Sequence, residues 1–185
     1  MSIKTNIKSN LTKTGVLVGA MWFVHLLDYV LVVYSLKKNG IIPRNIASID
    51  GILWAPFLHG DFNHLISNSM ALVPLTFVMF LFYKRTTFWA MLIIVISGGL
   101  LLWCFGREAN HIGASGLIYG QVSFLIASGW FRRNFKAISI ALIIGFIYGG
   151  LIWGVFPTQS GVSWEGHLFG AVGGVLAAMG LKDHD

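Results

Sequence analysis

A serine flanked by glycines is the first group in the sequence whose surroundings could support chemistry. Ser115 lies in the segment HIGASGLIYG, in which Gly113 and Gly116 permit a tight turn and the close approach of another backbone. The serine opens an apolar segment, and the N–H groups and positive dipole of a helix N-terminus favour a developing anion. Tyr119 follows on the same helix face. The motif alone is weak, since small residues also serve packing in membrane helices.

A histidine and an asparagine share one helix face in the segment HGDFNHLISN. His64 and Asn68 are spaced i and i+4, and we expect His59 and Asn63 to cap the start of their helix. Two histidines and an aspartate could suggest a metal site. However, no carboxylate shares the face of His64 and Asn68, and no HExxH motif is present. We therefore expect no metal and no other cofactor.

A third segment, GHLFGAVGG, places His167 on one helical stripe with Gly170 and Gly174. Glycines on that stripe remove side-chain bulk, so this helix can press against another helix that carries small residues. The helix that follows the serine offers such residues at Gly116 and Gly120. This packing could bring the histidine ring beside the serine hydroxyl. The alternative is a packing or gating histidine without a chemical role.

These three segments together contain the parts needed for serine acyl transfer. Each begins an apolar helix that runs inward from the same membrane surface, so the serine, the histidine and the His64–Asn68 pair lie at similar depth. A nucleophile, a base and polar donors to an oxyanion are the components of that chemistry. Glu165 is two residues before His167 and faces away from it, which makes it a poor triad acid. His25 and Asp28 are spaced i and i+3, and we interpret them as a structural hydrogen-bonded pair or a water-facing patch.

The composition indicates a membrane protein. Of the 185 residues, 56% are hydrophobic and 11% are charged, whereas soluble domains carry about 25% charged residues. This excludes an ordinary soluble globule, a disordered tail and a nucleic-acid-binding module. The net charge is +6, but the basic residues lie between apolar runs rather than in one patch. The single cysteine, Cys104, excludes an internal disulfide and a multi-thiolate metal site.

Six apolar segments are candidates for membrane spans. A spanning helix needs about 20 mostly apolar residues, and the segments lie at about 15–36, 64–83, 88–105, 115–131, 137–156 and 164–181. We therefore expect an all-α, polytopic membrane protein with a single domain over residues 1–185. A short tail at about 1–14 precedes the first span, which should stay as an uncleaved anchor. The segment 37–63 is too apolar for a solvated loop and should dip into the outer interface.

The basic residues predict the orientation. If both termini share one side, that side carries Lys4, Lys8, Lys13, Lys84, Arg85, Arg132, Arg133, Lys136 and Lys182. The other side carries Lys37, Lys38, Arg44 and Arg107. Because basic residues are enriched in cytoplasmic loops, we expect both termini in the cytoplasm.

The three motifs in register resemble the rhomboid family of intramembrane serine proteases. The matching elements are APFLHGDFNHLISN, HIGASGLIYG and GHLFGAVGG, and their order matches the minimal six-helix bacterial form over nearly the whole chain. The resemblance implies a dyad without a carboxylate, in which Ser115 is the nucleophile and His167 the general base. It implies that His64 and Asn68 form the oxyanion hole with the Ser115 N–H. It also implies supporting roles for His59, Gly113, Gly116, Tyr119, Gly170 and Gly174.

The function that the resemblance implies is hydrolysis of peptide bonds in or near the spans of single-span membrane proteins. The setting would be the bilayer of a bacterial inner membrane, with no nucleic-acid partner. Two other functions stay open. One is a catalytically inactive rhomboid-like protein that binds client helices. The other is a small transporter or channel lined by His25, His64 and His167.

Overall fold

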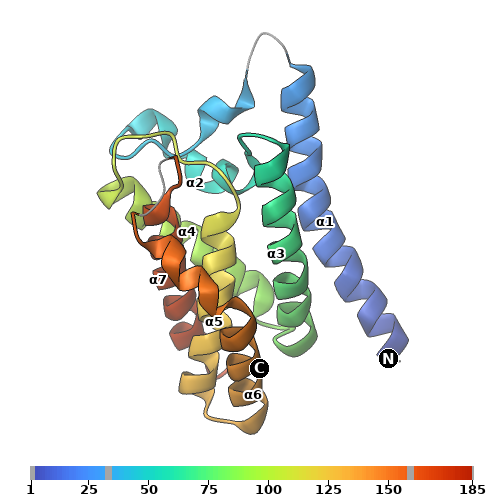
Figure 1. The fold of residues 1–185 in the computed structure, drawn as a ribbon. Coiled ribbons are helices and arrows are strands. Elements are labelled where there is room, and N and C mark those ends of the chain that lie inside the picture. Colours follow the sequence, from blue (N-terminus) through green and yellow to red (C-terminus); the bar gives the residue numbers. More distant parts are fainter. Residues whose placement is uncertain (1–2, 32–34, 158–160, 185) are drawn as a thin grey trace.

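The computed structural model describes residues 3–31, 35–157 and 161–184, with side chains from Ile7 onward. It is all-helical, and the described residues contain no strand, only an isolated bridge between Ile41 and His111. The long helices (Figure 1) are α1 (Ile3–Val30), α3 (Phe62–Phe82), α4 (Thr87–Phe105), α5 (Ser115–Arg132), α6 (Phe135–Tyr148) and α7 (Trp164–Gly180). The shorter elements are η1 (Leu36–Asn39), η2 (Ile46–Ser48), α2 (Gly51–Trp54), η3 (Ala55–Phe57) and η4 (Gly149–Val155).

Each of the six predicted segments coincides with a helix, with some boundaries displaced. α1 begins at Ile3 rather than near residue 15 and ends at Val30, so the predicted tail is mostly helical. Residues 32–34 of the predicted first span lie outside the described residues. The polar residues before Gly15 include no Pro or Gly, so nothing in their propensity stops the helix at the apolar boundary. α6 gives way at Tyr148 to the 3-10 helix η4, where the chain becomes rich in glycine. The outer segment 37–63 is folded into short helical turns.

Short polar side chains cap the starts of α3, α6 and α7. α3 is capped by Asp61, whose carboxylate accepts a 2.9 Å hydrogen bond from the His64 backbone N–H. The prediction that His59 and Asn63 cap this helix is therefore wrong. The His59 side chain is buried, and Asn63 lies inside the first turn, past the position where a cap is needed. The caps of α6 and α7 are Asn134 and Ser163.

α5 and α7 approach each other through glycines. A Cβ at Gly170 would overlap the Gly116 carbonyl oxygen, and a Cβ at Gly174 would overlap the Gly120 carbonyl oxygen and the Ser123 hydroxyl. This is the helix pair that the glycine stripe indicated. α4 packs on the neighbouring face of α7, and α1 lies at the edge of the bundle beside α3 (Figure 1). The three helices that carry the predicted site, α3, α5 and α7, all begin at the upper end of the bundle in Figure 1.

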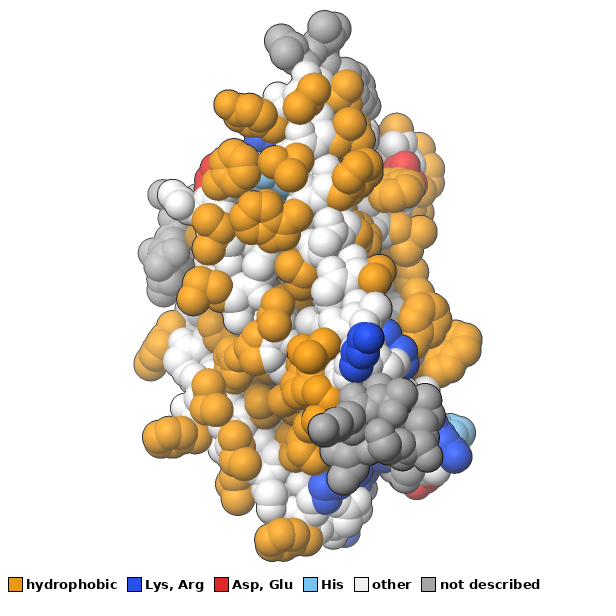
Figure 2. Space-filling view, turned by 90° about the vertical axis from the view of Figure 1, so that its right-hand side faces the viewer, with side chains coloured by type: hydrophobic (Ala, Val, Ile, Leu, Met, Phe, Trp, Pro, Cys, Tyr) orange, Lys and Arg blue, Asp and Glu red, His pale blue; other side chains and the backbone are white. Residues whose placement is uncertain are grey.

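The surface of the bundle is apolar. Among the described residues, three helical segments are long and apolar enough to cross a membrane: Phe62–Phe82, Thr87–Phe105 and Phe135–Val155. α1, α5 and α7 do not meet the same criteria of length, hydropathy and charge, so this measure does not reproduce all six predicted spans. Large apolar side chains, such as Phe135, Leu142 and Phe146, are exposed. Figure 2 shows hydrophobic side chains along the full height of one face, as expected for a surface in lipid.

The glycine contact between α5 and α7 generates a first prediction. Gly174→Ala should destabilise the protein by about 1–3 kcal/mol, the usual cost of overpacking, because backbone oxygen has no room to retreat. Gly145→Ala in α6 is the matched control: its Cβ meets nothing within 4 Å. That variant should be as stable as the wild type or up to about 1 kcal/mol more stable. Thermal unfolding in detergent measures both, and equal melting temperatures for the two variants would contradict the contact.

Candidate active site

The predicted nucleophile, base and oxyanion side chains, together with Tyr119, meet in one cavity of about 950 Å³. α3 contributes His64 and Asn68, α5 contributes Ser115 and Tyr119, and α7 contributes His167. The segment η4 closes another side with Trp153 and Gly154. Side chains separated by about a hundred positions in the sequence therefore share one cavity, whose lining combines polar and apolar groups.

The His167 ring is held on two sides. It stacks on the Tyr119 ring with centroids 4.2 Å apart and planes 6° from parallel. Its Nδ1 lies 2.8 Å from the Gly154 carbonyl oxygen. Because a carbonyl oxygen only accepts, Nδ1 carries the proton and Nε2 keeps a lone pair in the neutral ring. A Cβ at Gly154 would overlap the Tyr119 hydroxyl, so the chain needs glycine at this position.

Ser115 is the first residue of α5 and lines the same cavity as His167. Within the described parts of the chain, no hydrogen bond joins its hydroxyl to the His167 ring. Nucleophile–base contacts in ligand-free sites are often long and tighten only when substrate binds. The Ser115 hydroxyl and the His167 ring therefore line the same cavity but are not hydrogen-bonded to each other in the described structure.

Asn68 presents a hydrogen-bond donor without an acceptor. The side chain is 6% exposed, and its Nδ2 has no partner among the described residues. Gly113 faces the same place with φ of +113°, and a Cβ there would lie 2.7 Å from the His64 ring and 3.5 Å from Asn68 Nδ2. A side chain at this position would be strained and would displace the histidine. A buried unpaired donor beside bare backbone is a suitable place for an oxygen that gains negative charge.

His59 lies behind this site rather than in it. Its ring is 1% exposed, does not line the large cavity, and packs edge-on against His64 with centroids 5.1 Å apart. Nδ1 lies 3.3 Å from the Phe57 carbonyl oxygen. Burial lowers the pKa of His59 to about 4, and the neighbouring His64 adds to this effect. The His59 ring is therefore neutral, and it packs against the His64 ring from behind.

The predicted pairing of His25 with Asp28 is wrong. The Asp28 carboxylate accepts hydrogen bonds from the Leu36 backbone N–H and the Ser35 hydroxyl, and it lies 3.6 Å from Lys37 Nζ. His25 turns instead toward the rings of His59 and Phe62. Two residues on one helix face bind separate partners here because α1 meets a different segment at each of them.

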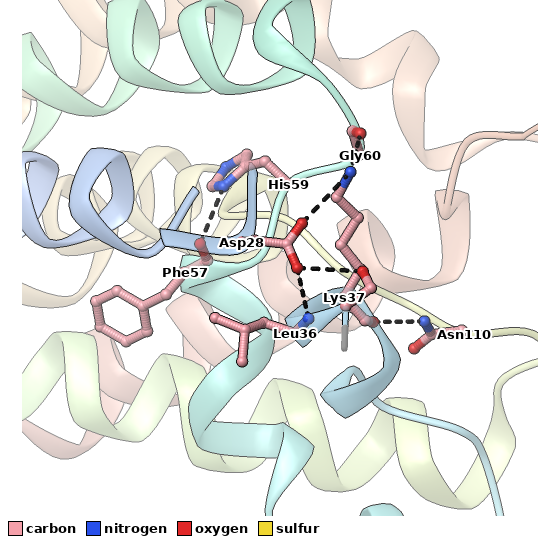
Figure 3. Close-up of polar contacts among 8 residues, drawn as sticks. Asp28, Leu36, Lys37, Phe57, His59, Gly60 and Asn110 are labelled. Carbon is pink, nitrogen blue, oxygen red and sulfur yellow. Dashed lines mark hydrogen bonds and ion pairs between the residues drawn. The ribbon is translucent and has the colours of Figure 1, made fainter. Parts of the chain in front are cut away.

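Figure 3 shows the contacts of Asp28 in α1 with Leu36 and Lys37, and those of Lys37 with Gly60 and Asn110. Lys37 Nζ donates to the Gly60 carbonyl oxygen at 2.8 Å, and Asn110 Nδ2 donates to the Lys37 carbonyl oxygen at 2.7 Å. Gly60 and Asn110 both line the cavity. The outer segment is thereby tied to the chain just before α3 and just before α5.

Sequence reasoning assigned no role to Gly154, His111 or Ser163. The sequence around Gly154 does not indicate a role for this glycine. Glycine is needed there because the Tyr119 and His167 side chains occupy the space that a Cβ would fill. His111 opens the serine motif, and Ser163 stands where a helix cap belongs, so both could have been noticed. Across the described residues, no group of three or more His, Cys, Asp or Glu side chains is arranged to hold a metal ion.

Comparison with known proteins points to one family. A family model described as the Rhomboid domain matches residues 47–183. Uncharacterized protein Rv1337 of Mycobacterium tuberculosis (strain ATCC 25618 / H37Rv) is 41% identical over 170 residues, which cover 87% of this chain and 70% of that protein. Uncharacterized protein ML1171 of Mycobacterium leprae is 38% identical over 168 residues, covering 85% and 66%. Protein L523 of Acanthamoeba polyphaga mimivirus, whose name assigns it provisionally to the rhomboid proteins, is 31% identical over 163 residues, covering 84% and 88%.

The lowered pKa of His59 predicts a pH-dependent stability. The unfolded histidine titrates near 6.5 and the folded one at about 4, so the unfolded chain binds more protons between these values. Stability should therefore fall as the pH falls through this window. The melting temperature in detergent should drop from pH 7 to pH 4.5, and His59→Phe should make that drop smaller. His184→Ala, at an exposed C-terminal position, should keep the wild-type pH dependence. A wild-type melting temperature that is the same at both pH values would refute the prediction.

Proposed function

The chain belongs to the rhomboid family, and on this premise we propose that it is an intramembrane serine endopeptidase. The observation that carries the proposal is the shared cavity. Ser115, His167, His64 and Asn68 come from three helices and line one chamber, which sits within a bundle that has an apolar surface. Such a chamber provides a polar setting for hydrolysis where lipid surrounds the protein.

The mechanism follows from the orientation of the His167 ring. Nε2 takes the proton from the Ser115 hydroxyl, and Oγ attacks the carbonyl carbon of the scissile peptide bond. The carbonyl oxygen becomes an oxyanion that accepts hydrogen bonds from Asn68 Nδ2, the His64 ring and the Ser115 N–H. The imidazolium ring is stabilised by the Gly154 carbonyl and by the face of Tyr119. It then gives its proton to the leaving amine, and water hydrolyses the acyl-enzyme with the ring as base again.

The substrate class follows from the same chemistry. An intact helix buries its carbonyl carbons within its own hydrogen bonds, so the target segment must unwind locally before Ser115 can attack. A single-span protein with small or helix-breaking residues near its outer end meets this requirement. The cavity of about 950 Å³ has room for a short extended segment together with water.

We propose that all six long helices span the membrane, with both termini in the cytoplasm and residues 1–185 forming one domain. The first turn of α1 and the last turn of α7 lie in the lower part of the bundle in Figure 1, away from the starts of α3, α5 and α7. Most of the Lys and Arg side chains visible in Figure 2 also lie in its lower half. The positive-inside rule then places the cavity on the outer side. The mycobacterial relatives support a bacterial cell membrane.

A second candidate is an inactive rhomboid-like protein that binds client helices without cutting them. The lack of a hydrogen bond between Ser115 and His167 in the described structure favours it. A transporter lined by three histidines has less support, because His25 does not line the cavity that holds His64 and His167. Cleavage of a substrate by the wild-type protein would support the protease function over both the inactive rhomboid-like protein and the transporter.

The central test is the loss of either member of the dyad. Ser115→Ala and His167→Ala should each abolish cleavage of a tagged single-span reporter in liposomes, because one variant lacks the nucleophile and the other lacks the base. Ser123→Ala removes a different α5 hydroxyl, one that donates to the Ala171 carbonyl oxygen of α7. This control should retain most of the activity. Full cleavage by Ser115→Ala would overturn the assignment.

The oxyanion role of Asn68 makes a quantitative prediction. Asn68→Ala should lower kcat by about 10²–10³-fold with little change in KM, because the donor is used mainly in the transition state. The matched control is Asn63→Ala, which removes an exposed asparagine at the start of the same helix. Initial rates over a range of reporter concentrations measure both. A kcat for Asn68→Ala within about threefold of the control would exclude this donor.

A further inference from the structure

The two loops that lead to Ser115 and His167 are joined by a second serine–histidine pair. His111 lies four residues before Ser115, and Ser163 lies four residues before His167. His111 Nδ1 is 2.7 Å from the Ser163 hydroxyl oxygen. The two residues that lie four positions before Ser115 and His167 are thus in direct contact.

The direction of this hydrogen bond is fixed by the other ring nitrogen. His111 Nε2 lies 3.0 Å from the Arg107 carbonyl oxygen, which only accepts, so Nε2 carries the proton of the neutral ring. Nδ1 then accepts from the Ser163 hydroxyl. The same hydroxyl oxygen accepts from the Gly166 N–H at 3.2 Å as the cap of α7. Ser163 therefore connects the ring of His111 to the first turn of the helix that carries His167.

His111 itself is firmly anchored. Its backbone N–H and carbonyl bond to Ile41 at 2.9 and 3.0 Å, and its side chain is 4% exposed. Two residues later, the Gly113 N–H donates to the Ala55 carbonyl oxygen at 2.8 Å. The outer segment thereby holds the approach to Ser115 through Ile41 and through Ala55, the first residue of η3.

Arg107 makes a parallel connection between the same two loops. Its Nη2 donates to the Val162 carbonyl oxygen at 2.6 Å, and its Nε lies 3.7 Å from Glu165 Oε1. Glu165 is buried, and this ion pair gives one of its carboxylate oxygens a charged partner. Two side chains of the α4–α5 loop therefore contact the start of α7. His111 contacts the cap residue Ser163, and Arg107 contacts Val162 before it and Glu165 after it.

We propose that Arg107, His111, Ser163 and Glu165 form a clasp that sets the separation between Ser115 Oγ and His167 Nε2, with His111–Ser163 as its controlling contact. The inference rests on the proposed protease function and names these as positioning residues, since the dyad itself does the chemistry. Loss of the clasp lets the first turn of α7 shift. A displacement of about 1 Å at a reacting pair can cost about 100-fold in rate.

The test is a double-mutant cycle on cleavage of the single-span reporter. Ser163→Ala removes the hydroxyl, and His111→Phe removes the ring nitrogens while leaving the α7 cap in place. Each should lower kcat about 10–100-fold with KM within about threefold. The double variant should be no slower than the slower single variant, because each single variant already removes the His111–Ser163 contact that controls the rate. Ser163→Thr keeps the hydroxyl and should restore kcat to within about threefold of the wild type.

Ser123→Ala is the control for a merely structural effect, since it removes another hydroxyl contact between α5 and α7. Its kcat should stay near the wild-type value even if its melting temperature falls as far as that of Ser163→Ala. A kcat for Ser163→Ala within about twofold of the wild type, losses that add in the double variant, or an equal loss in Ser123→Ala would each overturn the clasp.

The imidazole ¹⁵N spectrum of His167 gives a readout that does not require cleavage. Its resonances should shift in Ser163→Ala and His111→Phe and return in Ser163→Thr, while Ser123→Ala leaves them in place. If the wild type cleaves no substrate, the protease function fails but this spectrum still decides the clasp. An unchanged His167 spectrum in both clasp variants would refute it.

Discussion

The backbone contact between α5 and α7 is the constraint on which the other features depend. Lipid tails are as apolar as the side chains they meet, so helices in a bilayer gain little from the hydrophobic effect when they associate and rely on close packing and hydrogen bonds. Here Gly170 and Gly174 allow α7 to reach the carbonyl oxygens of Gly116 and Gly120. Because Ser115 and His167 stand at the starts of these two helices, the same contact brings them to one end of the bundle at one depth.

Polar side chains inside a membrane protein must be hydrogen-bonded or must face a cavity that water can enter. Each unsatisfied polar group in hydrocarbon costs several kcal/mol, so side chains such as His64, Asn68 and His167 face the cavity rather than the surface. Most of the groups around them are paired: the His167 ring with Gly154, the Asp28 carboxylate with Lys37, the His111 ring with Ser163. Several buried side-chain atoms of the described residues lack a hydrogen-bond partner, among them His59 Nε2 and Glu165 Oε2, but Asn68 differs from these two in that it lines the cavity. A donor kept without an acceptor is consistent with a site that is completed by a substrate oxygen.

Much of this arrangement could be predicted from the sequence. The three motifs and the apolar segments located the long helices, and the glycine stripe indicated which pair of helices packs closely. The family resemblance is confirmed by the match over residues 47–183. The details that were predicted wrongly have separate causes. α1 extends through polar residues that contain no helix breaker, and Asp61 rather than His59 caps α3. Asp28 binds Ser35 and Leu36, beyond the end of α1, instead of His25. Gly154 could not be predicted, because its importance depends on where α5 and α7 place Tyr119 and His167.

We propose that one serine in this cavity is made reactive by one histidine. Peptide mapping after treatment with a serine-directed fluorophosphonate probe can identify the reactive residue without any knowledge of the substrate. We expect an adduct on Ser115 that disappears in His167→Ala. An adduct on another serine, such as Ser163, or no adduct on the folded wild-type protein, would contradict it.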